Sequence, residues 1–413
     1  MRVLLSAYSA RAGHGTEPGI GWGWGRHLAE AGHHVTLLTH ERHAPANDTW
    51  LAQRQLDNLH IEYVASPTLS RALHGRLLSE RSARLLAYLA WQRVALRRAQ
   101  VLHAVSGFDV VHHVTYSSMI AGSPMWRLGA PFVFGPVGSG HLVPAAARPL
   151  FATGWPREQL RSGIVTATGW HLNPLARAAV RHAAVVLATN DATAQLARRL
   201  GARRVELMCD TGIDPPLAGR PRRPPQRGPR RVLWVGRLEP LKGLRLAVEA
   251  VAQAARHTDL EIHIVGHGSQ AAELARWTEE LGLAERSNHH GYLAWSEVQE
   301  LYAASDVLLF TSVRETFGSQ LVEAAASALP IVAVDLHGVA SILPDHAALK
   351  VPFIDVHTTA TALSDALTRV LTNNATYATL SAGAVSFAQS QTWPERVHRI
   401  ERLYAESMSG LAV

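Results

Sequence analysis

Residues 306–326 read DVLLFTSVRETFGSQLVEAAA. The apolar run from Asp306 to Thr311 is typical of a strand, and the run from Gln320 to Ala326 favours a helix. The stretch is therefore predicted to form a strand, a loop and a helix, with Glu315 in the loop and Glu323 about one turn into the helix. Because open parallel sheets bind ligands at the carboxyl ends of their strands, we expect the two carboxylates to hold one ligand at two points.

The start of this predicted helix is a candidate phosphate site. Free backbone amides at Phe317, Gly318 and Ser319 would point toward an anion, and the glycine lets the backbone approach it closely. A carboxylate further along can accept both hydroxyls of a ribose. A single glutamate on an alanine-rich helix is more often solvent-exposed, so the Glu315 to Glu323 spacing needs a second motif beside it.

That second motif lies upstream, where residues 231–243 read RVLWVGRLEPLKG. An apolar strand, a glycine turn and two cations, Arg237 and Lys242, precede a helical run over 244–255. Two cations at this position would neutralise a diphosphate and stabilise it as a leaving group. Lys242 and Lys350 are the only lysines among 40 basic residues, so a lysine here is unusual for this chain. The alternative is a lysine on a helix surface.

Together the two segments resemble the retaining glycosyltransferases of family 4, which have the two-domain GT-B fold. Further similarities are residues 265–268 after a strand, 291–293 before a helix, and 212–214 at the end of the first half. The resemblance implies that the catalytic residues are Arg237, Lys242, Glu315 and His113. It implies a donor site made of Gly19, Gly21, Gly236, Gly266, His267, Tyr292, Leu293, Phe317, Gly318, Ser319 and Glu323, with no metal.

Each implied residue has a distinct task. Arg237 and Lys242 would contact the donor diphosphate, Glu323 the ribose and Glu315 the transferred sugar. Backbone near Tyr292 and Leu293 would receive the base. No cofactor is expected beyond the nucleotide-sugar cosubstrate, of the UDP or GDP type.

The first half carries a glycine-rich stretch at residues 17–25, EPGIGWGWG, which we interpret as a loop after the first strand. Gly19 and Gly21 would allow a ligand to approach the backbone, and the helix would follow from Arg26. Trp22 and Trp24 are more often packing residues than binding platforms.

A histidine pair ends another predicted strand, at Asp109 to His113. Many relatives have a strand ending in His-any-His, whose second histidine reaches the transferred sugar. That position is Val114 here, and His113 comes one residue early, which would turn its side chain to the opposite face of the sheet. Either a bulge redirects His113, or the chain works without this histidine and uses His112, Thr115 or backbone instead.

Alternating strand and helix patterns predict an α/β fold: GT-B, with two doubly wound, Rossmann-like parallel-sheet domains facing across a cleft. We expect an acceptor-binding domain over 1–214, a linker rich in Pro and Arg over 215–230, and a donor-binding domain over 231–392. A helix within about 393–413 would return to the first domain. The predicted strands are Val3 to Ala7, His34 to Thr39, Asp109 to His113, Phe132 to Gly135, Val185 to Thr189, Val205 to Cys209, Val232 to Gly236, Glu261 to Val265, Val307 to Thr311 and Ile331 to Val334.

Composition and charge limit the classes of partner and the cellular compartment that we expect for this chain. The single cysteine, Cys209, excludes an internal disulfide and suits a reducing cytoplasm. Residues 1–214 hold 22 basic against 13 acidic residues, and the remainder 18 against 20. Arginines interleave with apolar residues over 69–105, which is compatible with peripheral contact with the inner face of the cell membrane; the alternative is an ordinary solvated face. No apolar run is long enough to span a membrane, and no nucleic-acid motif accompanies the basic residues. The arginines of this stretch are Arg71, Arg76, Arg81, Arg84, Arg93, Arg97 and Arg98.

The predicted activity is hexosyl transfer from a UDP- or GDP-sugar to the hydroxyl of a glycan, a glycolipid or a small molecule, with retention of anomeric configuration. Two alternatives share the architecture: a non-hydrolysing nucleotide-sugar 2-epimerase and a non-catalytic nucleotide-sugar sensor. The acceptor would be bound by loops of the first domain, and the sequence of those loops does not identify the acceptor.

Overall fold

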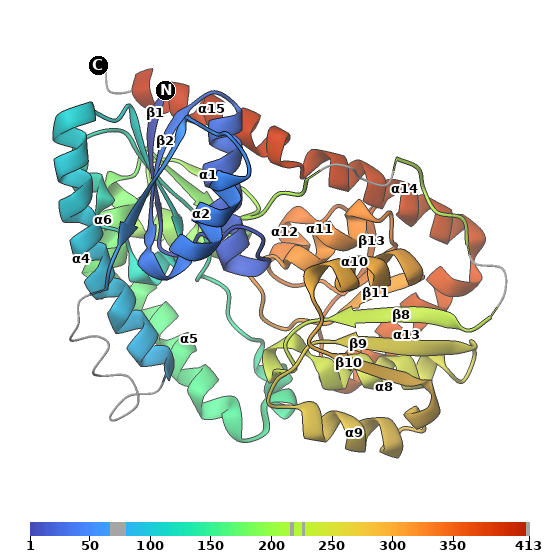
Figure 1. The fold of residues 1–413 in the computed structure, drawn as a ribbon. Helices are drawn as coiled ribbons and strands as arrows, with labels where there is room; N and C mark the ends of the chain where they lie inside the picture. Colours follow the sequence, from blue (N-terminus) through green and yellow to red (C-terminus); the bar gives the residue numbers. More distant parts are fainter. Residues whose placement is uncertain (67–79, 215–218, 225–227, 410–413) are drawn as a thin grey trace. The chain divides into compact units, whose positions relative to one another are not determined.

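The structure is a computed structural model that describes residues 1–66, 80–214, 219–224 and 228–409, with no side-chain description over 80–84. The chain divides into two compact units (Figure 1). Unit 1 comprises residues 1–140, 164–212 and 393–413, and unit 2 comprises 141–163 and 213–392.

Unit 1 is built on a parallel sheet with the strand order β3-β2-β1-β4-β5-β6-β7 in the described chain. The central strands are almost entirely buried, as expected for parallel strands covered on both faces. Its strands are β1 Arg2–Ala7, β2 His34–His40, β3 Leu59–Val64, β4 Val110–Thr115, β5 Phe132–Val137, β6 Val185–Ala188 and β7 Val205–Leu207.

Helices cover both faces of this sheet. Trp24 of α1 and Tyr404 of α15 pack on one face, and Trp91 of α4 packs on the other, in two separate apolar clusters. The helices are α1 Thr16–Glu30, α2 Ala44–Ala52, α4 Glu80–Ser106, α6 Pro174–His182, α7 Asp191–Leu200 and α15 Trp393–Ser409, with short 3₁₀ turns at Glu41–His43, Met119–Ala121 and Met125–Leu128.

Unit 2 has a second parallel sheet with the strand order β10-β9-β8-β11-β12-β13. The strands are β8 Arg230–Val235, β9 Leu260–Val265, β10 Ser287–Gly291, β11 Val307–Phe310, β12 Ile331–Val334 and β13 Ala348–Val351. The helices are α8 Leu244–Ala254, α9 Ala271–Glu280, α10 Trp295–Ala304, α11 Ser319–Ala326, α12 Gly338–Ile342, α13 Val356–Thr372 and α14 Asn374–Ser390, with 3₁₀ turns at Pro240–Lys242 and Ala284–Arg286.

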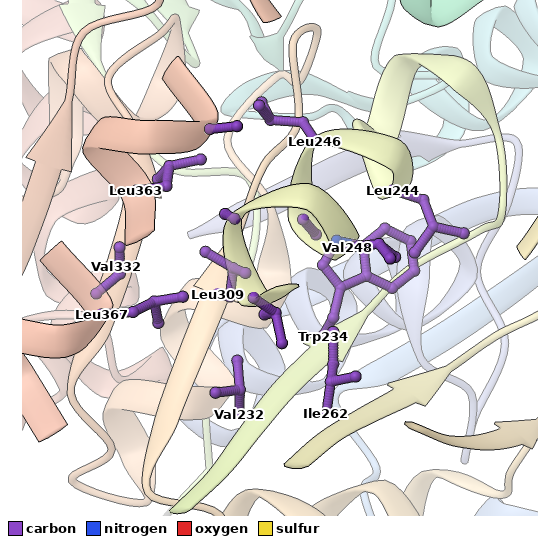
Figure 2. Packing of buried hydrophobic residues seen from close by; sticks show 14 of the residues in the cluster. Val232, Trp234, Leu244, Leu246, Val248, Ile262, Leu309, Val332, Leu363 and Leu367 are labelled. Atoms are coloured by element: carbon purple, nitrogen blue, oxygen red, sulfur yellow. The ribbon is translucent and has the colours of Figure 1, made fainter. Parts of the chain in front are cut away.

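The core of unit 2 lies between one face of this sheet and helices α8 and α13. Figure 2 shows Trp234 of β8 and Leu309 of β11 pointing toward Val248 of α8, with Leu363 and Leu367 of α13 beside them. These side chains are almost completely buried, so the core fixes the carboxyl ends of β8 and β11 relative to each other. The predicted fold class is confirmed: two parallel-sheet, Rossmann-like units.

One segment lies in a different unit from the one predicted. Residues 141–163 were expected within the first domain, but they belong to unit 2. The 3₁₀ segment Ala145–Gly154 places Leu150 and Phe151 in the apolar core of unit 2, and burial of these side chains holds the segment there. Helix α5, Trp155–Gly169, begins in unit 2 and ends in unit 1.

Within the predicted linker, Arg222 is hydrogen-bonded to unit 2. Residues 215–218 and 225–227 of the linker lie outside the described residues. The Arg222 guanidinium donates to the carbonyls of Tyr302, Ser305 and Ser327, at 2.7, 2.6 and 2.6 Å. Its backbone amide donates to Ser381 Oγ at 2.7 Å. Because these carbonyls end α10 and α11, one cation caps the carboxyl ends of both helices.

We expect Arg222→Ala to lower the free energy of unfolding of unit 2 by about 2–3 kcal/mol, because three carbonyls lose a charged donor. Urea denaturation followed by tryptophan fluorescence measures the change. Arg223→Ala is the matched control, since Arg223 is exposed in the same segment. Equal stability of the two variants would show that the Arg222 contacts add nothing.

Candidate functional site

The candidate site lies where β8 and β11 adjoin in the second sheet. Strand order reverses at this pair, since β9 and β10 extend on one side and β12 and β13 on the other. Such a switch point opens a crevice at the carboxyl ends of the strands. The loops after β8 and β11 are joined there: Val313 N donates to Leu241 O at 3.0 Å, and Thr311 Oγ1 donates to Lys242 O at 3.0 Å.

Gly243 makes this junction possible. Its φ is +66°, and a Cβ at this position would lie 2.2 Å from Thr311 O. Only glycine accepts both the left-handed conformation and the close approach. Lys242 is thereby held beside the β11 loop, and its residue is only 9% exposed.

Lys242 and Glu315 form an ion pair. The sequence predicted both as site residues but assigned them to different ends of a ligand; their direct contact was not anticipated. The switch point explains it, because the two loops leave adjacent strands. The pair places a cation and a carboxylate together at the position where a charged ligand would enter.

The pKa of Glu315 is lowered. Burial acts to raise it, but the Lys242 ammonium, the Thr316 amide and the charge of Arg237 together outweigh burial. The Thr316 amide donates to Glu315 Oε1 at 3.1 Å. Glu315 is therefore an ionised, oriented acceptor at neutral pH, suited to bind hydroxyl groups.

The amino terminus of α11 follows directly. Gly318 has φ +107°, and a Cβ there would lie 2.7 Å from the Phe310 ring. Phe317 is fully buried, and its ring lies 6.3 Å from that of Phe387, so its side chain belongs to the core and only its backbone can serve a ligand. The Leu321 amide donates to Gly318 O at 3.1 Å, so the amides that precede it in α11, at Ser319 and Gln320, are the ones that the helix itself does not use.

Glu323 projects from α11 one turn later. Tyr302 OH donates to its Oε2 at 2.9 Å. Burial raises the pKa of Glu323, although hydrogen bonds from Tyr302, Ser319 and Trp295 act to lower it. Tyr302 was not predicted as a site residue, because nothing in its position near the end of a predicted helix indicates contact with Glu323. It orients the carboxylate that was assigned to the ribose.

The remaining predicted donor residues lie at the ends of β8, β9 and β10. Arg237 is exposed, and its charge acts to lower the pKa of Glu315. Tyr292 is 74% exposed, and its ring meets that of His267 edge to face at 5.8 Å. Leu293 is half-buried beside it. The two rings leave an apolar surface open to a ligand.

Gly236 and Gly266 serve the chain's own packing. Gly266 has φ +135°, and a Cβ there would lie 1.9 Å from Gly236 O. Gly236 N donates to Val265 O at 3.0 Å, which holds the ends of β8 and β9 together. Their role as direct ligand contacts stays a prediction.

In unit 1, the glycine-rich stretch is helical, which corrects the predicted loop over residues 17–25. Helix α1 begins at Thr16, so Gly19 and Gly21 lie inside it. A Cβ on Gly19 would lie 2.0 Å from His14 O, and one on Gly21 would lie 2.1 Å from Ser9 O. The glycines thus let α1 pack closely against the loop after β1, and their role as donor contacts stays a prediction.

His113 lies in the core of unit 1. It is fully buried, and its Nε2 lies 3.4 Å from Tyr88 OH and 3.5 Å from Tyr116 O. The pairing of β1 with β4 does slip at Val114, but His113 precedes the slip and still faces α4. Burial lowers its pKa to about 4. His113 has no exposed surface in this structure, and its predicted contact with the transferred sugar stays a prediction.

Its neighbour His112 faces the other side of the sheet and is also structural. Its Nε2 donates to Gly135 O at 2.5 Å, so its Nδ1 accepts from Tyr404 OH at 2.6 Å. Burial lowers its pKa to about 3. Both ring nitrogens are engaged by the fold.

Glu17 is the carboxylate of unit 1 that the sequence left unassigned. It lies in the first turn of α1 and accepts from the Ser117 amide at 3.0 Å. Burial raises its pKa, although this hydrogen bond and the charge of Arg42 act to lower it. It is a protonatable group at the carboxyl ends of β1 and β4, the switch point of the first sheet.

Comparisons with known proteins agree with this geometry. Residues 22–210 match the family described as "Glycosyl transferase 4-like domain", and residues 220–386 match "Glycosyl transferases group 1". Sucrose-phosphate synthase from Thermosynechococcus elongatus superimposes with a TM-score of 0.67 at 19% identity, over 99% of this chain and 100% of that one. The chain has the GT-B glycosyltransferase fold.

Other GT-B structures and curated relatives are similar as well. HepE from Anabaena, solved in complex with UDP-glucose, gives a TM-score of 0.60 at 18% identity, over 99% of this chain and 100% of that one. A 2-deoxystreptamine glucosyltransferase from Streptomyces kanamyceticus is 37% identical over 28% of this chain and 30% of its own length. D-inositol 3-phosphate glycosyltransferase from Corynebacterium glutamicum is 27% identical over 43% of this chain. The chain thus spans 30% and 44% of these two relatives.

The basic face of this GT-B chain is only partly described. Arg71 and Arg76 lie outside the described residues, as do the side chains of Arg81 and Arg84. On α4, Arg93, Arg97 and Arg98 are exposed, and Arg98 pairs with Glu62 of β3 at 2.9 Å. No helix in the described residues has the length and apolarity to cross a bilayer.

Proposed function

We propose that the chain transfers a hexosyl group from a nucleotide-diphosphate sugar, of the UDP or GDP type, to an acceptor hydroxyl with retention of anomeric configuration. The observation that carries this proposal is the Lys242–Glu315 pair at the switch point of the second sheet. The amino terminus of α11 and the Tyr302-bound Glu323 follow it directly in the same unit.

The roles follow from the chemistry of these groups. Lys242, Arg237 and the first amides of α11 would stabilise the diphosphate as it leaves, without a metal ion. Glu315 would orient the transferred sugar through its hydroxyls, and Glu323 would accept the ribose hydroxyls. The edge-to-face rings of Tyr292 and His267 would lie beside the base. The acceptor would attack from the face that the diphosphate leaves.

Two relatives suggest which acceptors to test first. One is named for 2-deoxystreptamine and the other for D-inositol 3-phosphate. The complex of HepE with UDP-glucose likewise makes UDP-glucose the first donor to test. We further propose a cytoplasmic protein, with peripheral membrane contact as a separate hypothesis that sedimentation with anionic vesicles would test.

The test of the proposed function begins with donor binding. UDP, UDP-glucose, GDP and GDP-glucose are added in turn, and we expect one base to raise the melting temperature. Diphosphate release is then measured with each acceptor, and NMR of the product reports its anomeric configuration. Conversion of the donor without acceptor would indicate an epimerase instead. Binding without any release of diphosphate would indicate a sensor.

A further inference from the structure

His337 occupies a backbone conformation that normally requires glycine. It follows β12 and precedes α12, with φ +53° and ψ −119°. A side chain there costs strain, and such strain persists where the surrounding structure imposes it, most often at functional sites. The next residue, Gly338, has no room for a Cβ, which would lie 2.3 Å from Thr316 O. The turn is therefore pressed against the loop that carries Glu315.

The His337 ring is fixed in place. Its Nε2 donates to Val313 O at 3.3 Å, and its ring lies 5.3 Å from that of His141. His141 is 8% exposed, and its Nδ1 has no hydrogen-bond partner among the described residues. Because Nε2 carries the hydrogen, Nδ1 of neutral His337 is a hydrogen-bond acceptor.

Charged groups surround this ring. Arg314 Nη1 donates to Glu158 Oε2 at 2.6 Å, and Arg161 donates to the same carboxylate at 3.2 Å. Burial lowers the pKa of His337; the Val313 carbonyl raises it, Arg161 and Arg314 lower it, and Glu315 raises it. Since the net pKa lies below 6.5, the ring is mainly neutral at pH 7.

We propose that His337 is a donor-sugar residue, whose Nδ1 accepts a hydrogen bond from a hydroxyl of the sugar that Glu315 holds. This inference rests on the proposed function, and it adds a contact from the β12–α12 turn to the contacts from the β8 and β11 loops. It also gives a reason for a histidine at a position where glycine would be unstrained.

The test compares affinities for UDP-glucose and UDP by calorimetry at pH 7.5, in wild type, His337→Gly and His337→Asn. In His337→Gly, we expect the ratio of the UDP-glucose Kd to the UDP Kd to rise about two- to tenfold, as for one lost hydrogen bond. The melting temperature should rise by about 2 °C, because glycine relieves the strain. Asparagine tolerates positive φ and keeps an acceptor oxygen, so its ratio should stay within about twofold of wild type.

Three results would overturn the inference. The ratio could be unchanged in His337→Gly, the UDP affinity could fall as much as the UDP-glucose affinity, or His337→Asn could behave like His337→Gly. GDP-glucose and GDP replace the uridine pair if wild type binds those instead. A wild-type protein that binds neither pair would refute the proposed function itself, and the inference with it.

Discussion

Lys242→Ala should lower the turnover number about 10²- to 10³-fold, as expected when one fixed partner of a developing charge is removed. Affinity for UDP, or for GDP if that is the base, should fall about tenfold, because the diphosphate loses a charged donor. Steady-state kinetics and calorimetry measure the two effects. The variant also leaves Glu315 without its cation, so the melting temperature must be recorded beside them.

Lys350→Ala is the matched control for this variant, because Lys350 is the chain's other lysine. Its side chain is 15% exposed, against 11% for Lys242, and it pairs with Asp345 at 2.5 Å. It lies on β13, away from the switch point. If Lys350→Ala lost as much turnover as Lys242→Ala, or if Lys242→Ala kept near-normal turnover, the diphosphate assignment would be wrong.

Glu315→Gln should lower turnover by about 10²-fold without lowering affinity for the free nucleotide diphosphate, because Lys242 loses a competing anion. Glutamine keeps the size of the side chain but removes the charge that orients the sugar and faces the reacting centre. Both variants should lose turnover, but only Lys242→Ala should lose affinity for UDP, so a titration with UDP separates the two roles. Glu249→Gln is the control, since Glu249 is ion-paired with Arg245 and is 21% exposed, against 19% for Glu315.

The same pair predicts a pH dependence of stability. The pKa of Glu315 is lower in the folded chain than its ordinary value of 4.5. The stabilisation is therefore present above about pH 4.5 and is lost as the pH falls through the lower, folded pKa. Acid unfolding of wild type should be steeper there than that of Glu315→Gln. Parallel curves for the two proteins would contradict this coupling.

The central strands of both sheets could be predicted from sequence, and so could the edge strand β7, but three other edge strands could not. Strands such as β1 and β11 are continuous apolar runs because helices cover both faces. The missed strands, β3, β10 and β13, lie at sheet edges, where polar residues are only half-buried. The sequence SNHHG of β10 carries no strand pattern, so only pairing with β9 identifies it.

The part of the candidate site that could be predicted is the part whose position follows from the order of the strands. Motifs after two strands indicated Lys242 and Glu315, and the strand order brings those loops together. Tyr302 and His337 were missed because their roles depend on packing: one side chain reaches a neighbouring helix, and the other is held in a conformation that its residue type disfavours. The glycines of α1 caused a wrong prediction: glycine-rich sequence usually indicates a loop, but residues 17–25 are helical.

The path of the chain between its two units limits how this enzyme can be re-engineered. The backbone passes from one unit to the other four times, at residues 140–141, 163–164, 212–213 and 392–393. A chimera joined only at the Pro/Arg linker would therefore carry a foreign 141–163 segment into unit 2, where Leu150 and Phe151 must fit the core. A chimera that exchanges unit 2 between relatives therefore has to transfer residues 141–163 and 213–392 together, because the two segments fold as one module.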